Sequence, residues 1–156
     1  MKTIVIYATK YGAAGEVAKR IAGMMNGAVA CDLKLGGVPS LADFDSIIIG
    51  SSLYAGMIRK EAKVFVSKNA GVLREKKLGL FLCGLDASEE KTFFETNFSA
   101  DILQAAKAKG FFGGIFDPKK ANALERFIIK IVSKRTKYAN TIDDSKIEQF
   151  VERMKA

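Results

Sequence analysis

The chain has 156 residues, of which 49% are hydrophobic and 27% are charged, a composition typical of a folded globular protein. It has no histidine and only two cysteines, which excludes His-dependent catalytic triads, most zinc sites and a disulfide framework. The formal net charge of +8 indicates an anionic partner, which can be a phosphate ligand, an anionic lipid, a nucleic acid or an acidic protein.

The chain begins with a predicted strand, loop and helix. Residues 3–8 are apolar and rich in β-branched side chains, and Val17 and Ile21 stand at helical spacing after a loop of small residues. In such a loop the backbone N–H groups point into the turn, and the positive end of the helix dipole lies there. Both features favour the binding of a phosphate. Because residues 9–15 lack the GxGxxG and GK[ST] patterns, an ordinary strand-to-helix turn stays open as the alternative.

Strands and helices alternate along the rest of the chain, without a long linker or a repeat. This alternation predicts a single α/β domain at residues 1–156, with a doubly wound, five-stranded parallel sheet and helices on both faces. In such sheets ligands bind beyond the carboxyl ends of the strands, so we expect loops 9–15, 51–57 and 83–88 on one rim. Further strands are predicted at 28–33, 45–50, 78–83 and 111–116, one helical turn at 41–43, and helices at 62–73, 99–110 and 143–154.

The chain resembles the flavodoxin family. The resemblance rests on the strand, loop and helix with Thr9 and Gly12, on the segment DSIIIGSSLYAG at 45–56, and on the loop after Cys83. It implies the strand order 2-1-3-4-5 and FMN as cofactor, with the phosphate in the first loop and the flavin ring between the other two. The residues implied are Thr9, Lys10, Tyr11, Gly12, Ala13 and Ala14 for the phosphate, and Ser51, Ser52, Leu53, Tyr54, Ala55, Gly56, Cys83, Gly84, Leu85 and Asp86 for the ring.

The first loop departs from the family pattern, which often has hydroxyl residues at the positions of Thr9, Tyr11 and Ala14. Only Thr9 matches. A lost hydrogen bond to a charged group costs about 1.5–3 kcal/mol, so we expect weaker phosphate binding, sustained by backbone N–H groups and by Lys10. Tyr54 is predicted to stack on the flavin, and the alternative is a tyrosine packed on the protein surface.

A second resemblance concerns an insertion at about 117–138. Apolar residues recur there at helical spacing, among seven basic and two acidic residues, which gives this segment a charge of +5. The flavodoxin-type, menaquinone-dependent protoporphyrinogen IX oxidases carry a similar Arg-Phe-rich amphipathic insertion. This resemblance implies a role in heme biosynthesis, with a porphyrinogen as substrate and a quinone as acceptor. The basic residues from Lys119 to Lys137 suit an anionic membrane surface, or equally a helix packed on the sheet with a solvated basic face.

Two other functions stay open at this stage. The first is a non-enzymatic electron carrier that exchanges electrons with a redox protein, although such flavodoxins are usually acidic. The second is a cofactor-free interaction module, which Tyr11 and Ala14 favour and Tyr54 opposes. No aromatic-interleaved basic motif supports nucleic-acid binding, no metal site is predicted, and no residue is assigned as a catalytic acid or base. Since no signal peptide or apolar run of about 20 residues is visible, we expect a cytoplasmic protein, with peripheral membrane contact open.

Overall fold

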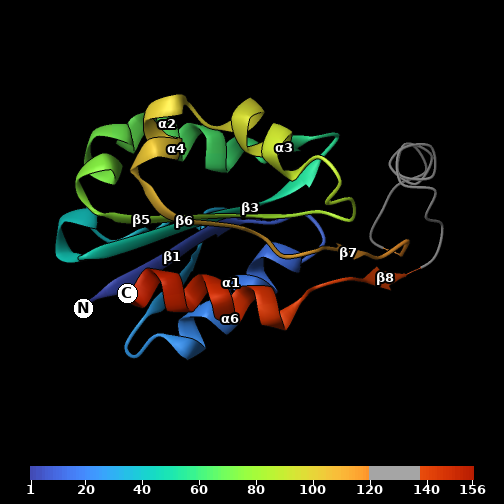
Figure 1. Ribbon diagram of the computed structural model, residues 1–156, viewed down its shortest axis with the longest axis horizontal. Coiled ribbons are helices and arrows are strands. Elements are labelled where there is room, and N and C mark those ends of the chain that lie inside the picture. Colours follow the sequence, from blue (N-terminus) through green and yellow to red (C-terminus); the bar gives the residue numbers. More distant parts are fainter. Residues whose placement is uncertain (120–137) are drawn as a thin grey trace.

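The computed structural model describes residues 1–119 and 138–156, and its centre is a parallel sheet (Figure 1). The strands lie in the order β2-β1-β3-β5-β6, and short β4 pairs antiparallel with β3. This confirms the predicted order 2-1-3-4-5, because β5 and β6 are the fourth and fifth parallel strands. The bounds are β1 Thr3–Ala8, β2 Val29–Asp32, β3 Ser46–Tyr54, β4 Met57–Ile58, β5 Lys77–Cys83 and β6 Ala106–Phe111.

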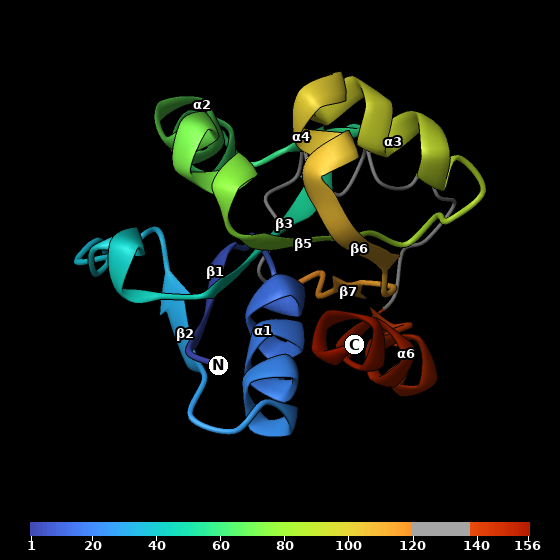
Figure 2. The ribbon, with the colours of Figure 1, turned by 60° about the vertical axis from the view of Figure 1, so that its left-hand side comes forward.

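Helices cover both faces of the sheet, as predicted (Figure 2). Helices α1 (Ala13–Met24) and α6 (Asp144–Lys155) lie on one face, and α2 (Lys60–Glu75), α3 (Glu90–Asn97) and α4 (Ala100–Ala105) lie on the other. A single 3₁₀ turn, η1 (Leu41–Asp43), follows β2. Within the described ranges no helix is both long enough and apolar enough to cross a membrane.

The central strands are buried on both sides, which explains their continuous apolar sequences. In β1, Ile4 and Ile6 pack in the core beneath α2, whereas Val5 packs in the core beneath α1 and α6. In the last helix, Ile147 and Phe150 are fully buried, as the helical spacing predicts. Two separate cores therefore fix the sheet from above and below, and they hold the carboxyl ends of β1, β3 and β5 at a common edge.

Both elements predicted for residues 99–116 are displaced in the structure. Ser99 caps α4 as expected, since its hydroxyl accepts a hydrogen bond of 3.4 Å from the Ile102 N–H. The helix then ends at Ala105, not at Gly110, and β6 takes its place. Exposed Lys107 and Lys109 alternate with buried neighbours, and this period of two outweighs the helix preference of alanine and lysine.

The second half of the predicted fifth strand leaves the main sheet. Strand β7 (Ile115–Phe116) pairs antiparallel with β8 (Ala139–Asn140) in a separate two-stranded ribbon (Figure 1). Gly113 makes the departure possible, because its φ of +87° is rare for other residues. Thr141 then holds the ribbon, since its hydroxyl accepts a hydrogen bond of 3.0 Å from the Gly114 N–H.

The last helix begins where the sequence predicts. The Asp143 carboxylate accepts hydrogen bonds from the backbone N–H groups of Ser145 (3.0 Å) and Lys146 (3.3 Å), and also from the Ser145 hydroxyl. These hydrogen bonds lower the pKa of Asp143, and the one from the Ser145 hydroxyl contributes most. The charged carboxylate therefore caps α6 at neutral pH. Most of the amphipathic insertion predicted at 117–138 lies outside the described residues.

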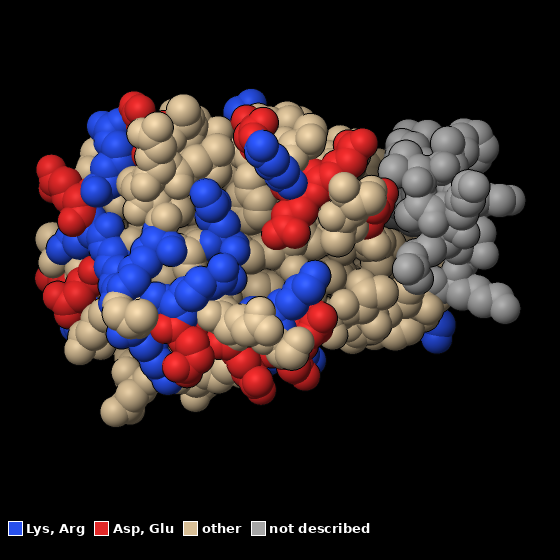
Figure 3. Space-filling view, in the orientation of Figure 1, with Lys and Arg blue, Asp and Glu red and all other residues tan. Residues whose placement is uncertain are grey.

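Basic side chains gather at the amino ends of the strands, near the two chain termini (Figure 3). There the Nζ atoms of Lys77 and Lys107 both contact the Ala156 carbonyl oxygen. The neighbouring Lys77 side chain lowers the pKa of Lys107. Part of the positive charge of the chain therefore stands away from the loops that follow the strands.

Candidate functional site

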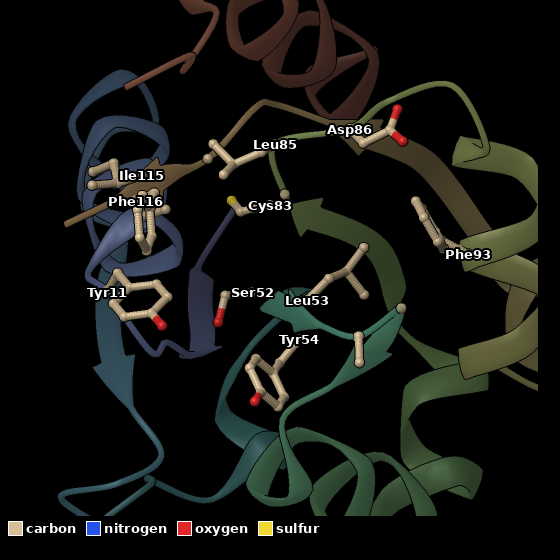
Figure 4. Close-up of a pocket in the computed structure, with 15 residues that line it drawn as sticks. Tyr11, Ser52, Leu53, Tyr54, Cys83, Leu85, Asp86, Phe93, Ile115 and Phe116 are labelled. Carbon is tan, nitrogen blue, oxygen red and sulfur yellow. The ribbon is translucent and has the colours of Figure 1, made fainter. Parts of the chain in front are cut away.

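A cavity opens where the carboxyl ends of β1, β3 and β5 meet (Figure 4). Its volume is about 820 Å³, including space open to solvent. Tyr11 and Phe116 lie on one side of it, and Leu53 and Phe93 lie on the other (Figure 4). The cavity walls are thus mainly apolar and aromatic, with few polar groups.

The structure brings most of the predicted site residues to this cavity. Thr9 and Lys10 instead line a neighbouring basic cleft, and Gly12 lines a third hollow beside Arg20. Ala14 and Ser51 are buried and line none of these three spaces. The predicted residues that line the cavity are Tyr11, Ala13, Ser52, Leu53, Tyr54, Ala55, Gly56, Cys83, Gly84, Leu85 and Asp86.

The first loop directs the start of α1 toward the cavity. Gly12 precedes the helix with a φ of +95°, and its N–H donates a hydrogen bond of 3.0 Å to the Thr9 hydroxyl. Ala13, the first helical residue, lines the cavity. The N–H groups of the first helical turn have no partner within the helix, so this end of the cavity suits an anion.

The acidic residue in the first turn of α1 is neutralised by a neighbour. Arg20 binds Glu16 at 3.2 Å and Asp144 at 2.7 Å. Burial disfavours the Arg20 charge, but the hydrogen bonds and charges of Asp144 and Glu16 raise its pKa overall. The Glu16 carboxylate therefore opposes an anion at the helix terminus only weakly.

The second loop, predicted for residues 51–57, is shorter in the structure and forms a tight hairpin. Strand β3 continues to Tyr54 and pairs with Met57 in β4. The two residues between them, Ala55 and Gly56, have φ values of +51° and +76°. Positive φ at both positions is typical of a type I′ turn, in which asparagine, aspartate and glycine are more common than alanine.

Asn97 holds this hairpin from α3, and the sequence did not reveal its role. Its Oδ1 accepts a hydrogen bond of 2.9 Å from the Ile58 N–H. Its Nδ2 donates to the carbonyl oxygens of Gly56 at 2.9 Å and Phe93 at 2.8 Å. A helix was not predicted at Glu90–Asn97, so no sequence signal connected Asn97 with the hairpin.

Lys10 stands between two aromatic rings that border the cavity. Its Nζ lies 4.7 Å from the ring centroid of Tyr54 and 5.6 Å from that of Tyr11. Its backbone N–H donates a hydrogen bond of 3.0 Å to the Ser52 hydroxyl, which ties the first loop to β3. A cation over aromatic faces is electrostatically favourable. Lys10 therefore places a positive charge at this edge of the cavity.

The third loop contributes a neutral thiol and a charged carboxylate. Cys83 is buried, and burial raises the pKa of its thiol, so it stays protonated at neutral pH. The Asp86 carboxylate accepts hydrogen bonds from the Ser88 side chain and backbone N–H, and these lower the pKa of Asp86. Cys83 therefore acts as a small apolar wall residue, whereas Asp86 is ionised.

The cavity also includes residues that sequence analysis missed. Phe93, Gly114, Ile115 and Phe116 line it. The Phe116 ring meets the Tyr11 ring edge to face, with centroids 5.9 Å apart. The Gly84 N–H donates a hydrogen bond of 2.9 Å to the Gly113 carbonyl, so the two segments lie close together. Only the aromatic and glycine-rich composition of residues 111–116 could have indicated this role.

This arrangement fits a flat aromatic group with a phosphate. The aromatic and apolar walls suit a planar ring, and the start of α1 suits the anion. In the part of the chain that the structure describes, no group of three His, Cys, Asp or Glu side chains is placed to hold a metal ion.

Comparisons with known proteins agree with this architecture. Residues 4–143 match the model of the flavodoxin domain, and no curated protein sequence matches the chain. Among solved structures, oxidised flavodoxin 1 from Bacillus cereus is 17% identical, with a TM-score of 0.56 over 99% of this chain and 95% of that one. A short-chain flavodoxin associated with a non-canonical PDU bacterial microcompartment is 16% identical, with a TM-score of 0.56 over 99% and 96%. Rubredoxin oxygen:oxidoreductase from Desulfovibrio gigas is 13% identical, with a TM-score of 0.53, and the match covers 99% of this chain but 37% of that one.

Proposed function

This chain belongs to the flavodoxin domain family, its cofactor is FMN, and we propose that the cavity is the site where it binds FMN for electron transfer. When bound, FMN supplies the redox chemistry, because its ring accepts and donates electrons. The observation that carries this proposal is that the start of α1 and the aromatic walls open into one cavity.

The residues divide into two roles in this proposal. Backbone N–H groups of residues 9–14, with the Thr9 hydroxyl, hold the phosphate. The Tyr54 ring covers one face of the flavin, and residues 83–86 flank the other. Phe116 and Tyr11 exclude water from the side of the cavity, and Asp86 places a negative charge at its rim.

A simple experiment tests FMN binding. The purified protein should be yellow, and denaturation should release FMN in preference to FAD, because one phosphate fits the first loop. A colourless protein that takes up no added flavin would contradict the proposal. It would also favour the alternative, a cofactor-free interaction module with the same fold.

We further propose that the reaction resembles that of the protoporphyrinogen IX dehydrogenases, with a porphyrinogen as donor and a quinone as acceptor. This proposal rests on the sequence of the basic insertion and on the net charge of +8, which distinguishes the chain from acidic electron carriers. Turnover of protoporphyrinogen IX with menaquinone is the direct test. If the FMN-loaded protein oxidises no porphyrinogen but passes electrons to a redox protein, the carrier function replaces this one.

The insertion also motivates a proposal of peripheral contact with an anionic membrane, where a quinone is available. Replacing Lys130, Lys134 and Arg135 with Glu should abolish binding to vesicles that contain anionic lipid, without changing FMN affinity. A matched variant with Glu at exposed Lys60, Lys63 and Lys68 of α2 changes the net charge equally, and it should retain binding. Binding of the wild-type protein should also fall with salt, because ions screen exposed charges within about 8 Å at physiological ionic strength.

A further inference from the structure

A basic cleft lies beside the cavity, and the proposed FMN site accounts for Thr9 and Lys10 at its edge but not for Lys34 and Arg59. It is lined by Ala8, Thr9, Lys10, Lys34, Arg59 and Glu61. Its volume is about 480 Å³, including space open to solvent. The end of β1, the loop after β2 and the start of α2 meet there, so the cleft and the cavity share the same rim of the sheet.

The positive charge of this cleft is only partly offset by neighbouring carboxylates. Among the described residues that line it, Glu61 is the acidic one. Within residues 1–119 and 138–156, neither Lys34 nor Arg59 forms a salt bridge, whereas Arg20 and Arg74 are both paired. Asp32 stands close by and adds a negative charge, and its carboxylate accepts a hydrogen bond of 2.9 Å from the Lys34 backbone N–H. The lining nevertheless carries three cationic side chains, those of Lys10, Lys34 and Arg59, against these two carboxylates. The cleft therefore keeps an excess of positive charge.

Two buried serines fix the backbone on which the cations stand. The Ser51 hydroxyl accepts a hydrogen bond of 2.9 Å from the Arg59 N–H, and it donates one of 2.9 Å to the Ser52 carbonyl oxygen. The Ser52 hydroxyl accepts a hydrogen bond of 3.0 Å from the Lys10 N–H. Both serines are buried at the end of β3. The pair of serines thus fixes the backbone of Arg59 and Lys10 at the same strand end.

Lys10 connects the cleft with the cavity. It lines the cleft, and its Nζ lies over the rings of Tyr54 and Tyr11, which both line the cavity. An acidic group in the cleft would therefore lie next to a flat molecule at the mouth of the cavity. Arginine and lysine bind carboxylates and phosphates through strong charge-assisted hydrogen bonds.

We propose that this cleft binds the acidic groups of the small molecule that exchanges electrons in the cavity. The substrate class is a flat apolar molecule with at least two carboxylates or phosphates. Its apolar body lies at the cavity, and its acidic groups lie against Lys34 and Arg59. This inference rests on the proposed function, because it assigns the substrate class of the same site.

The test measures binding of a porphyrin diacid to the FMN-loaded protein. Deuteroporphyrin IX has a flat body and two carboxylates, and its dimethyl ester has the same body without charge. Porphyrin fluorescence gives both dissociation constants. We expect the wild-type protein to bind the diacid at least tenfold more tightly than the diester. Inorganic pyrophosphate should compete with the diacid if phosphates are held equally well, and failure to compete would restrict the class to carboxylates.

The variant Lys34→Gln/Arg59→Gln separates this proposal from FMN binding. It should weaken diacid binding about tenfold or more, and leave diester binding and FMN affinity unchanged. A control variant, Lys63→Gln/Lys68→Gln, removes the same charge from α2 outside the cleft and should bind the diacid like the wild type. Equal binding of diacid and diester, unchanged diacid binding by the cleft variant, or displacement of FMN by the diacid would each overturn the proposal. Failure of the wild-type protein to bind FMN would instead overturn the proposed function.

Discussion

The side-chain amide of Asn97 donates a hydrogen bond of 2.9 Å to the Gly56 carbonyl oxygen, and so joins α3 to the hairpin that borders the cavity. The hairpin needs this support, because Ala55 has a φ of +51°, an uncommon conformation for a residue other than glycine. Asn97 also binds the Ile58 N–H on the other side of the turn. The hairpin position, and with it the position of Tyr54, thus depends on a residue outside the cavity.

Asn97→Ala should loosen this hairpin. The substitution leaves the Gly56 carbonyl and the Ile58 N–H without their side-chain partner, and an unsatisfied buried group costs about 1–3 kcal/mol. We expect lower stability in denaturant unfolding and weaker FMN binding in a fluorescence titration. Asn69→Ala is the control, since among the described residues the Asn69 side chain donates only to the Phe65 carbonyl oxygen of its own helix. If both variants bind FMN as the wild type does, the hairpin does not need Asn97.

Tyr54→Ala should weaken FMN binding three- to tenfold, because aromatic stacking adds about 0.5–1.5 kcal/mol beyond the buried area. The flavin fluorescence that Tyr54 quenches should also recover. Tyr54→Phe keeps the ring, so its affinity and quenching should stay near those of the wild type. Unchanged affinity and an unchanged spectrum in Tyr54→Ala would place this tyrosine away from the flavin.

Gly113→Ala should destabilise the protein strongly. A Cβ at this position would overlap the Thr141 carbonyl oxygen, and the φ of +87° disfavours any side chain. Gly71→Ala provides a contrast in the middle of α2, where an added Cβ meets no atom within 4 Å. There alanine should stabilise by about 0.5–1 kcal/mol, because glycine is a poor helix former. Thermal unfolding compares the two, and a fully stable Gly113→Ala would contradict the account of the β7–β8 ribbon.

Acid should remove the contribution of Asp143 to stability. The pKa of Asp143 is lower in the folded protein than its ordinary value, so the charged carboxylate stabilises the fold above that ordinary value, near pH 4. The contribution disappears as the pH falls through the lowered pKa. Thermal unfolding from neutral pH to about pH 3 should show the wild type losing its advantage over Asp143→Asn, which caps without a charge. A difference between the two that is independent of pH would contradict this role.

Buried strands and the first strand-to-helix turn were predictable because their patterns are local. The continuous apolar residues of β1, β3 and β5 report burial on two faces, and the carboxyl ends of those strands locate the cavity. The position of β6 was not predictable from helix preference, because only packing reveals that Ala108 and Gly110 face a core. Phe93 and Phe116 reach the cavity through tertiary contacts that no spacing encodes. The assignment of residues 1–156 to one domain and the binding roles of the site residues stay predictions.

A titration of the apo-protein with FMN, riboflavin and FAD tests the central claim most directly. The claim is that the cavity binds the flavin ring while the start of α1 and residues 9–14 hold one phosphate. Since a hydrogen bond to a charged group contributes about 1.5–3 kcal/mol, FMN should bind at least tenfold more tightly than riboflavin. FAD should bind more weakly than FMN, because its second phosphate and adenosine extend beyond the loop. Equal affinities for FMN and riboflavin would show that the first loop holds no phosphate and would contradict the assignment of this site.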